Sequence, residues 1–234
     1  MRWVGKDRGV FSIFDVCQSR DVKYLREYLD KGGNPDLQQS TKGNTLLWIA
    51  CNAPSESRFD HVKLLLERGA DPNKLVQYHD ETPLYTACRW GNVHRARLLL
   101  EHGANVNQPN KRGVTPLHIA SITDHVECVR LLVEHGADVN VKEQEGKTPL
   151  HLACYCGNPE CVRLLLTGDI EIDATDPSGY TAIFMACLTG KVSCLELLLE
   201  HGADASIPNA IGQTPETCAE EQGYTECVEV LRKV

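Results

Sequence analysis

Apolar and polar positions follow one another along the chain in a pattern that predicts pairs of short helices. Residues 113–140, GVTPLHIASITDHVECVRLLVEHGADVN, carry this pattern most clearly. Thr115 can cap a first helix through its hydroxyl group, and Pro116 suits the first helical position, where no amide donor is needed. A second helix is expected from His125 to Glu134. The side chains expected to face the core are Leu117, Ile119, Ala120, Val126, Val129, Leu131, Leu132 and Val133.

A glycine closes the second of these helices. Gly136 can adopt the left-handed conformation that ends a helix. Residues Ala137 to Lys142 are then expected to run out as an extended hairpin towards the next helix pair. One such pair cannot bury its apolar face alone, whereas stacked pairs share a continuous core whose stability is a sum over neighbours.

The pattern recurs with a nearly fixed period. The threonine that opens the first helix recurs at one constant interval, at Thr82, Thr115, Thr148, Thr181 and Thr214. Earlier units open with TLLW at Thr45 and FSIF at Phe11, and both steps there are slightly longer than that interval. The extra residues of the second unit fall in two loops, NAPSESRFDH and Leu75 to His79. We therefore expect seven units, at about 6–38, 39–75, 76–109, 110–142, 143–175, 176–208 and 209–234.

The segments TPLHIA and LLVEHGADVN, together with this period, resemble the ankyrin repeat over nearly the whole chain. The resemblance implies an all-α solenoid of seven stacked helix-turn-helix units with projecting β-hairpin loops. It also implies a single domain, 1–234, with a concave groove formed by hairpins and first helices. The first unit lacks TPLH, and the last unit is rich in glutamate, as the polar faces of terminal caps require.

Composition narrows the class of protein further. The 234 residues are 42% hydrophobic and 24% charged, which favours a folded chain over disorder. A net charge of −8 argues against nucleic acid as a partner, because that affinity depends on Lys and Arg. No stretch approaches the roughly 20 apolar residues of a membrane span, and no secretory signal is recognisable. We expect no membrane contact and a protein that is monomeric on its own, in the cytoplasm or alternatively the nucleus.

Eleven cysteines raise the question of disulfides or metal. Nine of them fall in two columns of the repeat, which are Cys17, Cys51, Cys88, Cys154 and Cys187, and Cys128, Cys161, Cys194 and Cys227. Buried thiols behave as small apolar side chains and stay unpaired in a reducing compartment. No cysteine pair has ligand spacing typical of zinc. We predict free thiols and no metal site.

No catalytic motif is present, since the chain lacks GxGxxG, GxxxxGK[ST], HExxH and GxSxG. The histidines fall in register instead: His118 and His151 in TPLH, and His102, His135 and His201 in EHGA. The resemblance implies that the TPLH imidazole bonds to the backbone and holds the hairpin. We therefore predict no enzyme, no catalytic residue and no cofactor.

Binding residues are sought where the repeat leaves positions variable. Trp90, Ile122, Tyr155 and Leu188 recur once per unit, at the end of the first helix. A contiguous apolar row on the surface usually marks an interface; the alternative is that these side chains only fold over their neighbours. Trp90 and Tyr155 are the expected anchors, and Arg89, Lys111 and Arg112 would attract carboxylates. The predicted partner-binding residues are Tyr78, His79, Arg89, Trp90, Lys111, Arg112, Ile122, Tyr155, Tyr180 and Leu188.

Function follows from this groove. We expect a non-enzymatic adaptor or scaffold that binds a protein or peptide. The alternatives are a regulatory inhibitor of a partner enzyme, and the substrate-recognition part of a larger ubiquitin-ligase or effector protein. The enlarged loop Ala53 to Arg58, with Leu75, Val76 and Tyr78, is a second candidate surface. The resemblance further implies that Asn107 and Asn140 can be hydroxylated.

Overall fold

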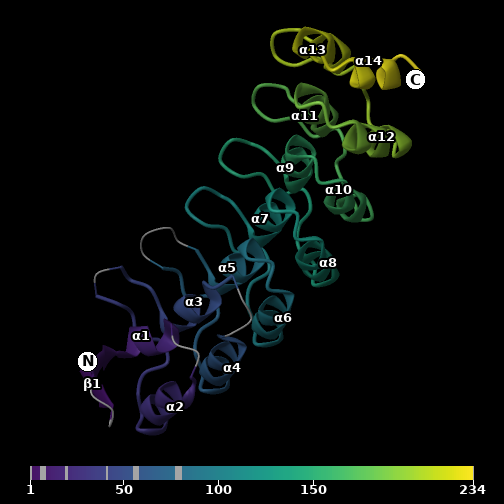
Figure 1. Cartoon of the computed structure of the whole chain (residues 1–234). Coiled ribbons are helices and arrows are strands. Elements are labelled where there is room, and N and C mark those ends of the chain that lie inside the picture. Colours follow the sequence, from purple (N-terminus) through teal and green to yellow (C-terminus); the bar gives the residue numbers. More distant parts are fainter. Residues whose placement is uncertain are drawn as a thin grey trace. The chain divides into compact units, whose positions relative to one another are not determined.

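The computed structural model describes residues 2–5, 9–18, 21–40, 42–54, 58–76 and 81–233. The chain forms two compact units, which we call the N-terminal unit (Met1–Lys111) and the C-terminal unit (Arg112–Val234). The described residues contain fourteen helices in seven successive pairs (Figure 1). The predicted all-α repeat fold is therefore confirmed.

The N-terminal unit opens with a short antiparallel pair of strands, β1 (Arg2–Gly5) and β2 (Gly9–Ser12). Three helix pairs follow: α1 (Ile13–Gln18) with α2 (Lys23–Asp30), α3 (Leu46–Cys51) with α4 (Phe59–Glu67), and α5 (Pro83–Arg89) with α6 (Val93–Glu101). Helix α3 packs between α1 and α5, and α4 packs on α6. The landmark Phe11 lies in β2, so the first helix starts at Ile13, with Ser12 accepting a hydrogen bond from the Phe14 amide at 3.2 Å.

The C-terminal unit contains four helix pairs in two layers. They are α7 (Pro116–Ile122) with α8 (Val126–Glu134), α9 (Pro149–Cys156) with α10 (Pro159–Leu165), α11 (Ala182–Leu188) with α12 (Val192–Glu200), and α13 (Pro215–Gln222) with α14 (Thr225–Leu231). Each first helix packs on the next first helix, and each second helix on the next second helix. The connecting loops project on the side of the first helices (Figure 1).

The predicted threonine caps account for where the first helices begin. Thr115, Thr148, Thr181 and Thr214 have extended backbones, and each hydroxyl oxygen accepts from the amide three residues later. Proline occupies the first turn of α7, α9 and α13, as expected. Gly136 follows α8 with a φ of 77°, which agrees with its expected place after the helix.

The core consists of leucine, alanine and cysteine columns. Of the eleven cysteines, all are free thiols, ten are buried and Cys156 is half-buried. Burial raises the pKa of the Cys51 and Cys161 thiols to about 12. The expected core list was partly wrong, because Ile119, Val126 and Val133 are only partly covered.

Projecting loops of the C-terminal unit form five-residue turns rather than strand ladders. The Asp176 amide donates to the Tyr180 carbonyl at 3.0 Å, while the Asp176 carboxylate accepts from the Tyr180 amide at 3.0 Å. Glu143 and Lys147 make the same pair of bonds, and so do Asn209 and Gln213. At the base of each loop, a side-chain oxygen thus accepts one of the two hydrogen bonds that a main-chain carbonyl would accept in a strand pair. The loop base is therefore held together without a β-ladder.

Two loop glycines provide a test of how closely neighbouring loops approach. Gly179 and Gly212 both have positive φ, 79° and 81°. A Cβ atom on Gly179 would lie 2.8 Å from the Ala210 amide nitrogen, whereas one on Gly212 would meet nothing within 4 Å. Alanine costs about 1–2 kcal/mol in this conformation at either site. We expect Gly179→Ala to destabilise the chain by at least about 1 kcal/mol more, because the Ala210 amide to Ser178 carbonyl bond must shift.

Urea unfolding of the two glycine variants measures this difference. Equal losses of unfolding free energy would show that the loops do not press on one another at Gly179.

Candidate functional site

A surface hollow with a volume of about 410 Å³ lies between α9 and α11, and we call it the α9/α11 hollow. Three of the predicted partner-binding residues, Tyr155, Tyr180 and Leu188, line it together. The other lining residues are Lys147, Leu152, Asp176, Ser178 and Met185. The structure thus brings part of the predicted row to one place.

Helix geometry explains why these side chains meet. Leu152 and Tyr155 lie three residues apart on α9, and Met185 and Leu188 occupy the equivalent positions on α11. Residues three apart share one face of a helix. Met185 is buried, while 49% of the Tyr155 surface is exposed. An exposed ring beside an aliphatic wall offers a site for an apolar side chain from another molecule.

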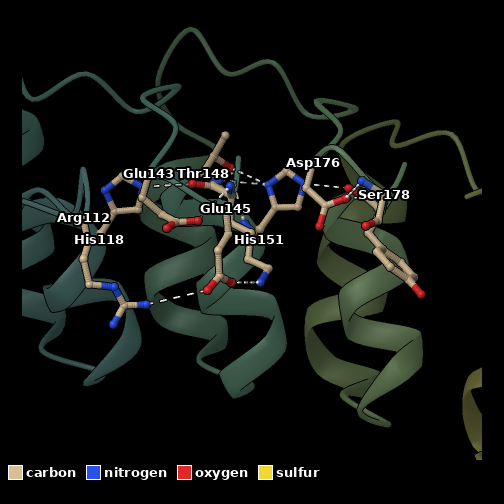
Figure 2. A network of polar contacts seen from close by, with 10 residues as sticks. Arg112, His118, Glu143, Glu145, Thr148, His151, Asp176 and Ser178 are labelled. Carbon is tan, nitrogen blue, oxygen red and sulfur yellow. Dashed lines mark hydrogen bonds and ion pairs between the residues drawn. The ribbon is translucent and has the colours of Figure 1, made fainter. Parts of the chain in front are cut away.

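Two buried histidines, His118 and His151, bond to carbonyl groups of loop residues that line the α9/α11 hollow (Figure 2). The His118 Nε2 atom lies 3.1 Å from the Lys147 carbonyl oxygen, and the His151 Nε2 atom 3.0 Å from the Tyr180 carbonyl oxygen. Their Nδ1 atoms lie near the cap residues, with His151 2.8 Å from the Thr148 hydroxyl. These bonds agree with the role that the resemblance implied for the TPLH histidines.

A fall in pH is expected to weaken the attachment of these loops by His118 and His151. Burial lowers the pKa of His118 and of His151, because the charged imidazolium loses its hydration. In the unfolded chain the same histidines take up protons near pH 6.5. The stabilising contribution of the neutral rings is therefore present above about pH 6.5 and is lost as the pH falls below it.

Urea unfolding at pH 7.5 and at pH 5 is expected to show this loss. The matched variant is His151→Phe, since Phe184 occupies the equivalent position one repeat later and is fully buried. The variant should lose less stability than the wild type on acidification. An identical loss would mean that His151 does not contribute to the pH dependence.

Charged side chains next to the α9/α11 hollow pair with one another, whereas Arg112 was expected to attract a carboxylate of a partner. Glu145 lies 2.6 Å from Lys147 Nζ and 3.6 Å from the Arg112 guanidinium. The hydrogen bond between Glu145 and Lys147 lowers the pKa of Glu145 and raises that of Lys147. Arg112 therefore faces a carboxylate of its own chain (Figure 2), which weakens the idea that it attracts one from a partner.

A second exposed surface lies in the N-terminal unit. Trp90 is 39% exposed, and its indole nitrogen donates to the Asn52 side-chain oxygen at 2.8 Å. The Arg89 guanidinium lies 6.0 Å from the Trp90 ring centroid and 3.6 Å from Glu81. These contacts hold the indole in place at the end of α5. Tyr78 and His79 lie outside the described residues, as do residues 55–57 of the enlarged loop.

Other predicted residues are placed differently. Ile122 is half-buried at the end of α7 and does not line the α9/α11 hollow. Lys111 is exposed at the end of the N-terminal unit. The Asn140 side chain donates to the Asp169 carbonyl at 2.8 Å and accepts from the Glu171 amide at 2.9 Å. It thus joins adjacent loops, and the Asn107 amide donates to the Asn105 side chain at 3.0 Å.

Lys147, Leu152, Asp176, Ser178 and Met185 were not among the predicted site residues. The signal for Leu152 and Met185 was available, since both precede a predicted residue by three positions on a helix. Asp176 could not be recognised, because its role depends on two backbone amides, those of Ser178 and Tyr180.

Within the ranges that the structure describes, no three His, Cys, Asp or Glu side chains are grouped so that they could hold a metal ion. In that same part of the chain, no helix has the length and apolar character needed to cross a membrane. The absence of a metal or cofactor from the protein's function stays a prediction.

Stacked helix pairs with a hollow on the loop side define a helical-repeat protein with a surface suited to binding. Residues 13–110, 105–176 and 168–233 match the family described as ankyrin repeats, in three copies. The chain belongs to the ankyrin-repeat family. Ankyrin repeats generally mediate protein–protein interaction, and proteins of this family are generally non-enzymatic.

Several characterised proteins are similar to parts of the chain. The B-cell lymphoma 3 protein homolog of Mus musculus is 35% identical over 102 residues, which is 42% of this chain and 22% of that protein. Ankyrin repeat and SOCS box protein 11 of Danio rerio is 42% identical over 89 residues, 37% of this chain and 28% of that protein. Protein phosphatase 1 regulatory subunit 12A of Mus musculus is 30% identical over 94 residues, 40% and 9% respectively. The matches therefore span less than a third of each of these relatives.

Proposed function

We propose that this chain is a non-enzymatic adaptor or scaffold that binds a protein or peptide partner in the α9/α11 hollow. The observation that carries the proposal is the exposure of Tyr155 beside Leu152, Met185 and Leu188. Tyrosine supplies a large contact area at a low cost in side-chain entropy, which is why it is frequent among dominant interface residues. The buried histidines that hold the neighbouring loops would keep the site preorganised.

The exposed Trp90, with Arg89 beside it, is proposed as a second contact. Lys111, Ile122, Tyr78 and His79 remain proposed contributors on the sequence pattern alone. We also propose that the seven repeats act as one domain. A cytoplasmic or nuclear location would suit eleven free thiols, and the net charge of −8 disfavours a nucleic-acid partner.

Two alternatives differ in the consequence of binding. The relatives include a phosphatase regulatory subunit and a SOCS box protein, which favours regulation of an enzyme or substrate recognition within a larger protein. Measuring a captured enzyme's activity with and without this chain separates inhibition from tethering. Hydroxylation at Asn107 or Asn140 is proposed only as a modification. A mass increase of one oxygen in protein from native cells would support it.

Affinity purification with three forms of the chain tests the proposal. The wild type, Tyr155→Ala and the matched control Tyr224→Ala are compared, because Tyr224 is 38% exposed on another helix pair. Proteins retained by the wild type and the control, but lost with Tyr155→Ala, are the expected partners. If the same proteins are retained by all three forms, the α9/α11 hollow is not the binding site.

A further inference from the structure

The row formed by Tyr155 and Leu188 continues into the last repeat as a carboxylate. Glu221 lies one repeat after Leu188, at the equivalent position near the end of α13, which packs on α11. It is exposed, and its Oε2 atom accepts a hydrogen bond from the Gln213 side-chain amide at 2.5 Å. Gln213 occupies the loop position of Lys147 and Tyr180, so the carboxylate is fixed on the same side as the α9/α11 hollow.

Neighbouring glutamates on α13 have a different environment. Glu216 accepts from the Arg232 guanidinium at 2.8 Å, and Glu220 also pairs with Arg232. Their charges are thus offset by a cation of α13's own repeat. Glu221 instead receives a neutral amide, which orients the carboxylate without offsetting its charge.

The net charge of the whole C-terminal unit also favours a basic ligand. Residues 112–234 contain 8 Lys and Arg against 19 Asp and Glu, a net charge of −11. Residues 1–111 contain 16 against 13, a net charge of +3, and the two values give the −8 of the chain. A field of this sign raises the rate at which a basic ligand reaches the unit.

Spacing links the hollow to Glu221. Packed helices lie about 8–10 Å apart, and an extended peptide advances about 3.3 Å per residue. The centre of the hollow, between α9 and α11, is about one and a half helix spacings from α13, so an extended chain needs about four residues to reach Glu221. We propose that the partner is an extended basic segment with an apolar side chain in the α9/α11 hollow and, about four residues away on the same face of the segment, a Lys or Arg that pairs with Glu221. This inference rests on the proposed function.

The probe is a peptide selected for binding to the intact chain from a display library of random twelve-residue peptides. The expected binders share an apolar residue and, about four positions away, a Lys or Arg. A synthetic peptide from the selection is then measured by fluorescence anisotropy. Glu221→Gln should weaken it by about two- to fivefold at low salt, and the loss should shrink at high salt.

The matched control is Glu200→Gln, because Glu200 is exposed at the end of α12 in the other helix layer. This change removes the same charge without touching the row, and it should leave the affinity nearly unchanged. Circular dichroism checks that both variants remain folded.

The outcomes distinguish the inference from the proposed function. Selected peptides that lose binding with Tyr155→Ala but not with Glu221→Gln would overturn the inference and leave the hollow as the site. Peptides without basic residues would overturn it as well. Binding that depends on neither Tyr155 nor Glu221 would overturn both proposals.

Discussion

Replacing Arg95 by Ala is expected to lower the free energy of unfolding of the N-terminal unit by about 3 kcal/mol or more. Arg95 is fully buried, and its guanidinium donates to the Ala53 carbonyl at 2.9 Å and to the Cys51 carbonyl at 3.2 Å. The Asn92 side chain also donates to Ala53. The truncation leaves a cavity and takes donors from carbonyl groups that lie in the interior.

Arg97 on the same helix is the control, because its side chain is exposed. Arg97→Ala should change stability by no more than about 0.5 kcal/mol. Urea unfolding followed by circular dichroism compares the two variants. Equal, small effects would mean that the free energy lost when the guanidinium is removed from water cancels the free energy gained from its hydrogen bonds.

Replacing Tyr155 by Ala is expected to weaken partner binding by about 2 kcal/mol, or roughly thirtyfold in Kd. The ring forms the exposed wall of the α9/α11 hollow, so its removal takes away contact area that an incoming apolar side chain would cover. Stability should change little in comparison, since about half of the Tyr155 surface is already in water.

Isothermal titration with a partner identified by affinity purification measures the effect, and Tyr224→Ala again serves as the control. The competing explanation is that Tyr155 only covers its neighbours. In that case Tyr155→Ala would lower the unfolding free energy while leaving Kd unchanged.

The fold was predictable because its information is local and repeated. A threonine hydroxyl that caps a helix and a glycine that ends one act within a few residues, and the same arrangement recurs in the next unit. Departures are equally physical. The first helix starts at Ile13 rather than near Phe11, because β2 extends to Ser12, which then supplies the cap.

The candidate site was less predictable, since it depends on how successive repeats meet. The sequence pattern predicted that Tyr155, Tyr180 and Leu188 lie on one face, and in the structure the three side chains line one hollow. It could not indicate that Glu145 would contact both Lys147 and Arg112. Likewise, nothing in the charge pattern separates the buried Arg95 from the exposed Arg97, because the difference lies in the carbonyl groups of Cys51 and Ala53.

Neighbouring loops of the C-terminal unit are joined by main-chain bonds at corresponding places. The Gln144 amide donates to the Arg112 carbonyl, and the Ala210 amide donates to the Ser178 carbonyl, both at 2.9 Å. Pro177 occupies the corresponding place between them and has no amide hydrogen to offer Glu145. The two loops beside the α9/α11 hollow can therefore move apart at Pro177 without breaking a main-chain hydrogen bond there, so the proposed binding site can adjust its width to partner side chains of different size.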